Sequence, residues 1–123
     1  MAYYLFNVVG DDAEAVAARL RAGMWSVAAD ERHRERLAAG DLVLVYLGAP
    51  ERVLIGRAEL ASAVREPLGG VLLAHVEEWD PPVPMSAVLS QIDRSAGARA
   101  DFDAGVVAIT VDEYETALAV ARS

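Results

Sequence analysis

The stretch RLAAGDLVLVYLGAP, residues 36–50, decides the fold of this chain. A Gly-Asp pair leads into six consecutive apolar residues, Leu42–Leu47, and a Gly and a Pro end the run. A strand without a polar face has both faces covered, as in a sheet that is sandwiched or closed. We therefore predict that Leu42–Leu47 is the central strand. Its side chains are expected to alternate between two faces, with Val43 and Val45 on one and Leu42, Leu44 and Tyr46 on the other.

Patterns on either side of this strand predict the other elements. Strands are expected at residues 3–10, 53–64, 71–79 and 106–109, with turn residues at 67–70. Helices are expected at residues 11–23, 30–40, 85–92 and 110–121, and a loop at 93–105. Asp11 with Glu14, and Thr110 with Glu113, have the spacing of a capping box, and Asp30 is placed to cap the second helix. Gly23 is expected to end the first helix. On the strand 71–79, the face of Leu72, Ala74 and Val76 is apolar, opposite His75, Glu77 and Trp79.

The order of these elements predicts one α+β domain over residues 1–123. About five strands, mostly antiparallel, are expected to form a small curled sheet or open barrel flanked by helices. The chain shows no internal repeat, linker or domain boundary.

Composition narrows the classes of partner. The formal net charge is −8, and all eleven basic residues are Arg, as is typical of a GC-rich genome. A net negative surface repels a phosphate backbone, so nucleic-acid binding would need a local patch. Without cysteine, the chain has neither disulfides nor thiolate metal sites. It shows no signal-peptide pattern and no apolar run long enough for a membrane span, so we expect a cytoplasmic, bacterial protein.

A search for catalytic and cofactor motifs is negative. The chain has no phosphate-binding loop and no dinucleotide fingerprint. Its two histidines, His33 and His75, are far apart in sequence, and His75 with Glu77 is too small a set to hold a metal. We therefore expect no catalytic residue, no metal and no cofactor.

Aromatic and small polar residues near strand ends suggest a binding site instead. Flat aromatic rings around a polar cleft suit a planar heterocycle, which is stacked on the rings and hydrogen-bonded at its edge. The alternative is that these aromatic residues only cap the core. The candidate ligand-binding residues are Asn7, Trp25, Ser26, Tyr46, Trp79 and Phe102.

An ordered series of short motifs resembles EVE-domain proteins, which belong to the PUA-like superfamily and are related to YTH readers. The series comprises the MWS segment at residue 24, Gly40-Asp41, Tyr46, Gly56 and Glu59. The later segments PPVPMSAVL and GVVAITVDEYETAL resemble the family's Pro-Val helix start and its final strand and helix. The first strand lacks the family's common Trp, and the loop after the first helix lacks the usual Arg-Asn pattern.

This resemblance implies a PUA-like open barrel and a binding module rather than an enzyme. Such domains are thought to read a modified base in DNA or RNA by taking it into an aromatic-lined pocket, where Tyr46 would lie at or near the edge. Two alternatives remain: a pocket for a small heterocyclic metabolite or free nucleoside, and an enzyme acting on a nucleotide. The modification, the choice between DNA and RNA, and the oligomeric state are not encoded in these motifs.

A basic segment follows Trp25 closely and is the candidate phosphate contact. Arg32, Arg34 and Arg36 lie within a few residues of one another and could hold the phosphates on either side of a flipped base. The alternative is a solvated helix face on which these arginines pair with Glu31 and Glu35.

Overall fold

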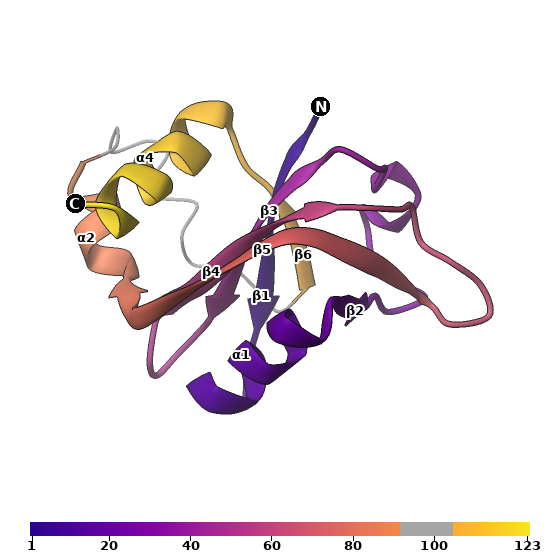
Figure 1. Ribbon diagram of the computed structural model, residues 1–123, viewed down its shortest axis with the longest axis horizontal. Helices are drawn as coiled ribbons and strands as arrows, with labels where there is room; N and C mark the ends of the chain where they lie inside the picture. The colour runs from indigo at the N-terminus through magenta and orange to yellow at the C-terminus, as the bar shows by residue number, and fades with distance from the viewer. Residues whose placement is uncertain (92–104) are drawn as a thin grey trace.

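The computed structural model describes residues 1–91 and 105–123 (Figure 1). The strands of this part are β1 (Tyr3–Val8), β2 (Met24–Ser26), β3 (Leu42–Leu47), β4 (Val53–Leu60), β5 (Gly70–Pro84) and β6 (Gly105–Ala108). Its α-helices are α1 (Ala13–Ala22), α2 (Met85–Leu89) and α4 (Val111–Ala121), and a 3-10 turn, η1 (Arg34–Arg36), precedes β3. The strands form one curled sheet in the order β2-β5-β4-β3-β1-β6.

The predicted central strand is confirmed, because β3 lies between β4 and β1. It pairs antiparallel with β4, where Val43 faces Ala58, and parallel with β1, where Leu44 faces Leu5. The parallel pair is possible because the chain between β1 and β3 is long enough to cross over. The other three pairings are antiparallel, so the sheet is mixed rather than wholly antiparallel. The sequence does not predict β2, because three residues are too few to show a periodic pattern.

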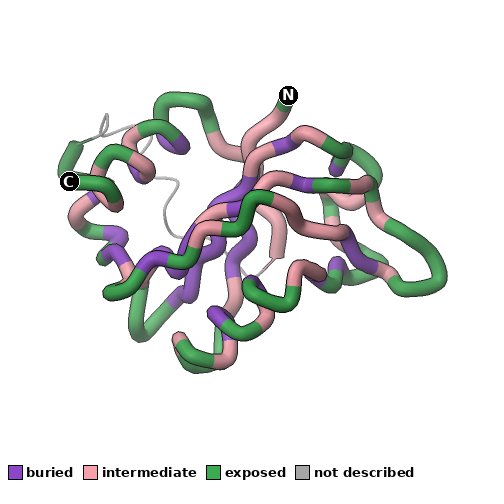
Figure 2. The backbone as a smooth tube through the Cα atoms, in the orientation of Figure 1, coloured by how far each residue is buried: buried purple, intermediate pink, exposed green. Residues whose placement is uncertain are grey.

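The two faces of the sheet carry separate core clusters, as the alternation in β3 predicted. Val43, Val45 and Leu47 pack in a cluster with α1. Leu44 and Tyr46 pack on the other face in a cluster with α2 and α4. Figure 1 shows α1 on one side of the sheet and α2 beside α4 on the other, and Figure 2 shows the buried stretches concentrated in the central strands.

The helix ends confirm two of the expected caps and correct two others. Gly23 ends α1 with φ 76°, and Thr110 with Glu113 forms a complete capping box at the start of α4. The cap of α1 is Asp12 rather than Asp11, and it accepts a hydrogen bond from the Ala15 amide at 2.8 Å. The helix expected over residues 30–40 is only η1, which has no side-chain cap. Leu37 is the one large apolar residue of that segment, so little packing holds a longer helix there.

β5 differs most from expectation. Val71 and Trp79 are buried, whereas Val76 is 36% exposed, so the predicted apolar face is wrong. The reason is irregular pairing with β4 and the positive φ of His75 (50°), which reset the alternation along the strand. β5 also continues through the prolines to Pro84. β2 pairs only with residues 70–72, so the part of β5 that contains these prolines has β4 on one side and an open edge on the other, where a missing amide is tolerated.

Candidate functional site

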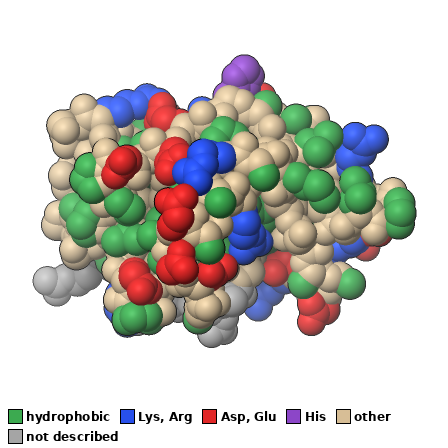
Figure 3. Space-filling model, turned by 60° about the horizontal axis from the view of Figure 1, so that its bottom comes forward, with side chains coloured by type: hydrophobic (Ala, Val, Ile, Leu, Met, Phe, Trp, Pro, Cys, Tyr) green, Lys and Arg blue, Asp and Glu red, His purple; other side chains and the backbone are tan. Residues whose placement is uncertain are grey.

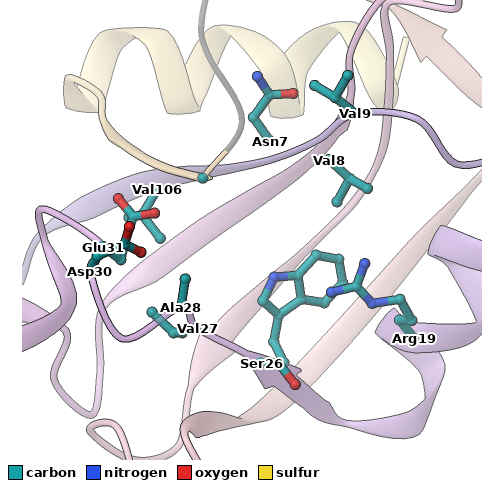
Figure 4. Close-up of a pocket in the computed structure, with 12 residues that line it drawn as sticks. Asn7, Val8, Val9, Arg19, Ser26, Val27, Ala28, Asp30, Glu31 and Val106 are labelled. Carbon is teal, nitrogen blue, oxygen red and sulfur yellow. The ribbon is translucent and has the colours of Figure 1, made fainter.

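A pocket lies between the two outermost strands of the sheet, where the curled sheet does not close (Figure 4). Its volume is about 380 Å³, which is within the range of small-molecule sites. β1 with the residue that follows it, α1 and β2 contribute Asn7, Val8, Val9, Arg19, Trp25 and Ser26 to its lining. The segment after β2 and the start of β6 contribute Val27, Ala28, Asp30, Glu31, Gly105 and Val106.

Trp25 forms the aromatic wall of this pocket. The residue is 4% exposed, and its indole stacks on the ring of Phe6, with centroids 5.8 Å apart and an interplanar angle of 28°. The guanidinium of Arg19 lies over the same indole, with Cζ 4.2 Å from the ring centroid. Phe6 therefore fixes the orientation of the wall, and Arg19 covers it.

Arg19 differs from the arginines that form ion pairs. Arg21, Arg34 and Arg122 each pair with a glutamate. Within residues 1–91 and 105–123, by contrast, Arg19 has no carboxylate partner. In the described part of the chain its guanidinium lies against the indole face, so its charge is available to an anionic group of a ligand.

The side of the pocket away from Arg19 is acidic (Figure 4). Asp30 is exposed, and Glu31 is half-buried. One carboxylate oxygen of Glu31 accepts a hydrogen bond from the Arg32 amide at 3.1 Å. Its other oxygen lies against Cα of Gly105, where a Cβ would collide with it. Gly105 also has a φ of 120°, a backbone conformation that favours glycine at this position.

The backbone of Ser26 faces the open edge of the sheet. In the pairing with β5, the Leu73 amide donates a hydrogen bond to the Gly23 carbonyl. The Val27 amide donates to the Gly69 carbonyl, and both bonds are 2.8 Å long. In an antiparallel pair such bonded residues alternate with non-bonded ones. Met24 and Ser26 are therefore non-bonded residues, and their N–H and C=O groups point away from β5. At Ser26, which lines the pocket, these groups offer a donor and an acceptor to a ligand.

Three of the residues expected at the site line the pocket: Asn7, Trp25 and Ser26. The side chain of Asn7 leaves β1 in the direction opposite to that of Val8 (Figure 4). It is buried on the other face of β1, near Gly48, because neighbouring residues of a strand alternate between faces.

The expected convergence of Tyr46 and Trp79 with Trp25 is not observed. Both pack in the cluster beneath α2 and α4, on the opposite face of the sheet. Tyr46 alternates with Val45, whose side chain packs on the face that Trp25 covers. The Trp79 indole N–H donates to Glu77 at 2.8 Å, away from the pocket. Phe102 lies outside the described residues.

The basic segment does not line the pocket either. Arg34 forms an ion pair with Glu66, a partner outside the segment, whereas Arg32 and Arg36 are exposed. The ring of His33 lies 5.9 Å from that of Tyr4. The pairing of these arginines with Glu31 and Glu35 by helical spacing does not arise, because the segment is a single 3-10 turn.

Arg19, Glu31 and Gly105 line the pocket, but no sequence motif predicts them there. Arg19 is one of two arginines on α1, and nothing in its helical position separates it from Arg21. Glu31 and Gly105 are 74 positions apart in the sequence and meet only because the sheet curls.

A second polar cluster lies between the sheet and α4. Arg57 donates through Nε to the Tyr114 hydroxyl at 2.9 Å and through a terminal nitrogen to the His75 carbonyl at 3.0 Å. Burial raises the pKa of Tyr114, although the hydrogen bond from Arg57 opposes this shift. The hydrogen bond from the Trp79 indole, together with Arg122, lowers the pKa of Glu77. These groups connect β4, β5 and α4 and serve the packing of α4.

Neither a metal site nor a membrane helix is found in the described part of the chain. No group of three or more His, Asp or Glu residues in residues 1–91 and 105–123 is arranged to hold a metal ion. None of the helices found there has both the length and the apolar character needed to cross a membrane.

Comparison with known proteins identifies the fold. No family model matches the chain, and no curated protein matches it. A hypothetical protein from Leishmania major is similar in structure, with a TM-score of 0.76 and 14% identity over 99% of this chain and 95% of its own. Human THYN1, solved in complex with DNA containing 5-methylcytosine, has a TM-score of 0.67 and 12% identity over 100% and 99% of the two chains.

ASCH from Zymomonas mobilis is also similar, with a TM-score of 0.59 and 14% identity over 97% of this chain and 95% of its own. At such low sequence identities, the structural similarity is evidence for the fold alone. The chain has the α+β, PUA-like fold, and its described residues form a curled six-stranded sheet with helices on both faces.

Proposed function

We propose that this protein is a non-catalytic EVE-like reader of a modified nucleobase in DNA or RNA. The observation that carries the proposal is the pocket at the open edge of the sheet. There Trp25 supplies an aromatic wall, and the Ser26 backbone supplies a donor and an acceptor at the rim. A base taken out of a nucleic acid needs such a flat surface and a few fixed polar groups. THYN1, which shares the fold, is known in complex with 5-methylcytosine-containing DNA.

The proposed ligand contacts are Trp25 and Ser26, together with Arg19 and Glu31. Arg19 covers the indole, so a base that stacks on this face takes the place of the guanidinium or stacks outside it. In both cases Arg19 stays close to the sugar-phosphate of the bound nucleotide. Of the basic segment, Arg32 and Arg36 remain candidates for flanking phosphates because they are exposed, whereas Arg34 is held by Glu66.

A pocket for a free nucleoside or small heterocyclic metabolite is the second candidate. The net charge of −8 and the acidic side of the pocket favour it, because both oppose a long polyanion. Figure 3 shows acidic side chains in a row on one face, with arginines beside them. Arg21, Arg34 and Arg122 are each neutralised by a glutamate, so they contribute little to the attraction of a polyanion.

Binding measurements separate the two candidates. The affinity for a modified nucleoside such as 5-methyldeoxycytidine is compared by calorimetry with that for a short oligonucleotide carrying the same base. A reader of nucleic acid binds the oligonucleotide more tightly, and its affinity falls as salt is raised. Equal or weaker binding of the oligonucleotide favours the metabolite pocket. If the nucleoside is converted to a product during a long incubation, the protein is an enzyme and both candidates are wrong.

A further inference from the structure

We infer that the pocket prefers a base that carries an exocyclic amino group, and that Glu31 is the residue that selects it. This inference rests on the proposed function and refines it by naming the chemical class of the base. It starts from the uneven distribution of charge in the pocket. Arg19 lies on one side, and Asp30 and Glu31 lie on the other (Figure 4).

This distribution orients a nucleotide in the pocket. The phosphate is repelled by the acidic side and attracted by Arg19, which has no carboxylate partner in residues 1–91 and 105–123. The edge of the base is therefore directed toward Asp30 and Glu31. Glu31 is the better placed of the two, because it is half-buried while Asp30 is exposed.

The position of the Glu31 carboxylate is defined by its neighbours. One oxygen accepts the Arg32 amide at 3.1 Å, and the other lies against Cα of Gly105 at the start of β6. A carboxylate has about four lone-pair sites, and one backbone hydrogen bond leaves most of them for a ligand. An ionised carboxylate only accepts hydrogen bonds, so the facing edge of the base has to donate.

Cytosine and adenine have the complementary edge. Each presents an amino group that donates, beside a ring nitrogen that accepts. The amino group is matched to the Glu31 carboxylate, which accepts its hydrogen bond. Uracil, thymine and hypoxanthine present a carbonyl oxygen where cytosine or adenine has the amino group. Two acceptors then face each other, which is unfavourable in a partly buried site.

Matched pairs of nucleoside 5′-monophosphates test this inference on the wild-type protein, because the phosphate is the group that orients the ligand. The pairs are the monophosphates of cytidine and uridine, of 5-methylcytidine and 5-methyluridine, and of adenosine and inosine; within each pair, the exchange of amino group for carbonyl is the principal difference. We expect the amino member of at least one pair to bind about tenfold more tightly or better, the effect of one charge-assisted hydrogen bond. Calorimetry at constant pH and salt provides the dissociation constants.

Glu31→Gln tests the assigned residue. The glutamine amide either donates or accepts, so the ratio of affinities within a pair is expected to fall to within about threefold of one. Glu35→Gln is the matched control, because Glu35 is exposed in η1 and does not line the pocket. For Glu35→Gln, the ratio of affinities within each pair is expected to equal that of the wild type. The melting temperatures of both variants are compared with that of the wild type to check that they fold.

The possible outcomes distinguish this inference from the proposed function. If the wild-type protein binds both members of every pair equally, the inference is wrong and the proposed function stands. If the preference is present but Glu31→Gln retains it, Glu31 is not the selecting residue. If modified nucleosides and oligonucleotides carrying them all fail to bind, the proposed function fails, and the inference fails with it. The wild-type ratios decide the preference even if Glu31→Gln does not fold.

Discussion

The guanidinium of Arg19 lies over the indole of Trp25, with Cζ 4.2 Å from the ring centroid. Arg19 is on α1 and Trp25 is on β2, so this contact joins the helix to the edge strand that forms the pocket. The most electron-rich surface of the pocket is thereby covered by a cation.

Removal of the guanidinium is expected to expose the indole. Arg19→Met keeps the length of the side chain but loses the cation–π contact, which is worth about 0.5–1 kcal/mol at a partly exposed site. Acrylamide quenching of tryptophan fluorescence should increase relative to the wild type. Arg21→Met is the control, since Arg21 lies on the same helix and pairs with Glu14 and Glu78 instead. Equal quenching in the two variants would contradict the covering role of Arg19.

The two tryptophans are expected to differ in their effect on binding. Trp25→Phe retains an aromatic side chain but reduces the stacking surface, and a loss of up to the ~1–3 kcal/mol typical of base stacking is expected in nucleoside affinity. Trp79→Phe should leave the affinity unchanged, because Trp79 packs on the opposite face of the sheet. Titration calorimetry on both variants provides the comparison. A larger effect at Trp79 would place the site between the sheet and α4.

The central strand provides a test of the fold. Leu44→Ala is expected to lower the free energy of unfolding by ~2–5 kcal/mol, because the side chain is buried and its loss leaves a cavity. Val111→Ala, at a position 44% exposed, should change stability by less than ~0.5 kcal/mol. Urea unfolding followed by circular dichroism measures both. Similar values at the two positions would show that β3 is not covered on both faces.

Glu77 is expected to contribute to acid sensitivity. Its pKa is lowered in the folded state, first by the hydrogen bond from the Trp79 indole and then by Arg122. A lowered pKa means that its contribution is present above the unfolded-state pKa and is lost as the pH falls through the folded-state pKa. Glu77→Gln should therefore destabilise the protein by less than ~1 kcal/mol at neutral pH and less still in acid. Thermal melts from pH 7 to pH 3 test this, with Glu51→Gln as an exposed control.

If the protein binds a nucleic acid, the exposed arginines Arg32 and Arg36 are expected to make its affinity depend on salt concentration. The double variant Arg32→Ala with Arg36→Ala is expected to flatten the log–log salt dependence of oligonucleotide binding by roughly one to two units. Arg34→Ala should change the slope less, because Arg34 is already paired with Glu66. An unchanged slope in the double variant would assign the phosphate contacts elsewhere.

The central strand of the sheet could be predicted from local sequence patterns. The six apolar residues Leu42–Leu47 predicted a strand covered on both faces, and the two core clusters on either side of β3 confirm it. The ends of α1 and α4 were also largely predictable, because Gly23 and the Thr110–Glu113 pair act through bonds between near neighbours in the chain. Local patterns report such interactions directly.

Which residues line the pocket depends on contacts between distant segments of the chain, and local sequence patterns do not report these contacts. Trp25 and Ser26 were predicted at the site, but their partners Arg19, Glu31 and Gly105 were not, because they meet only where the two edges of a curled sheet approach each other. Tyr46 and Trp79 were expected there and lie on the opposite face instead. The physical reason is that a strand directs successive side chains to opposite faces, while pairing, bulges and curl determine which distant residues share a face. A motif identifies residue types, but the folded sheet determines which of those residues line the same pocket.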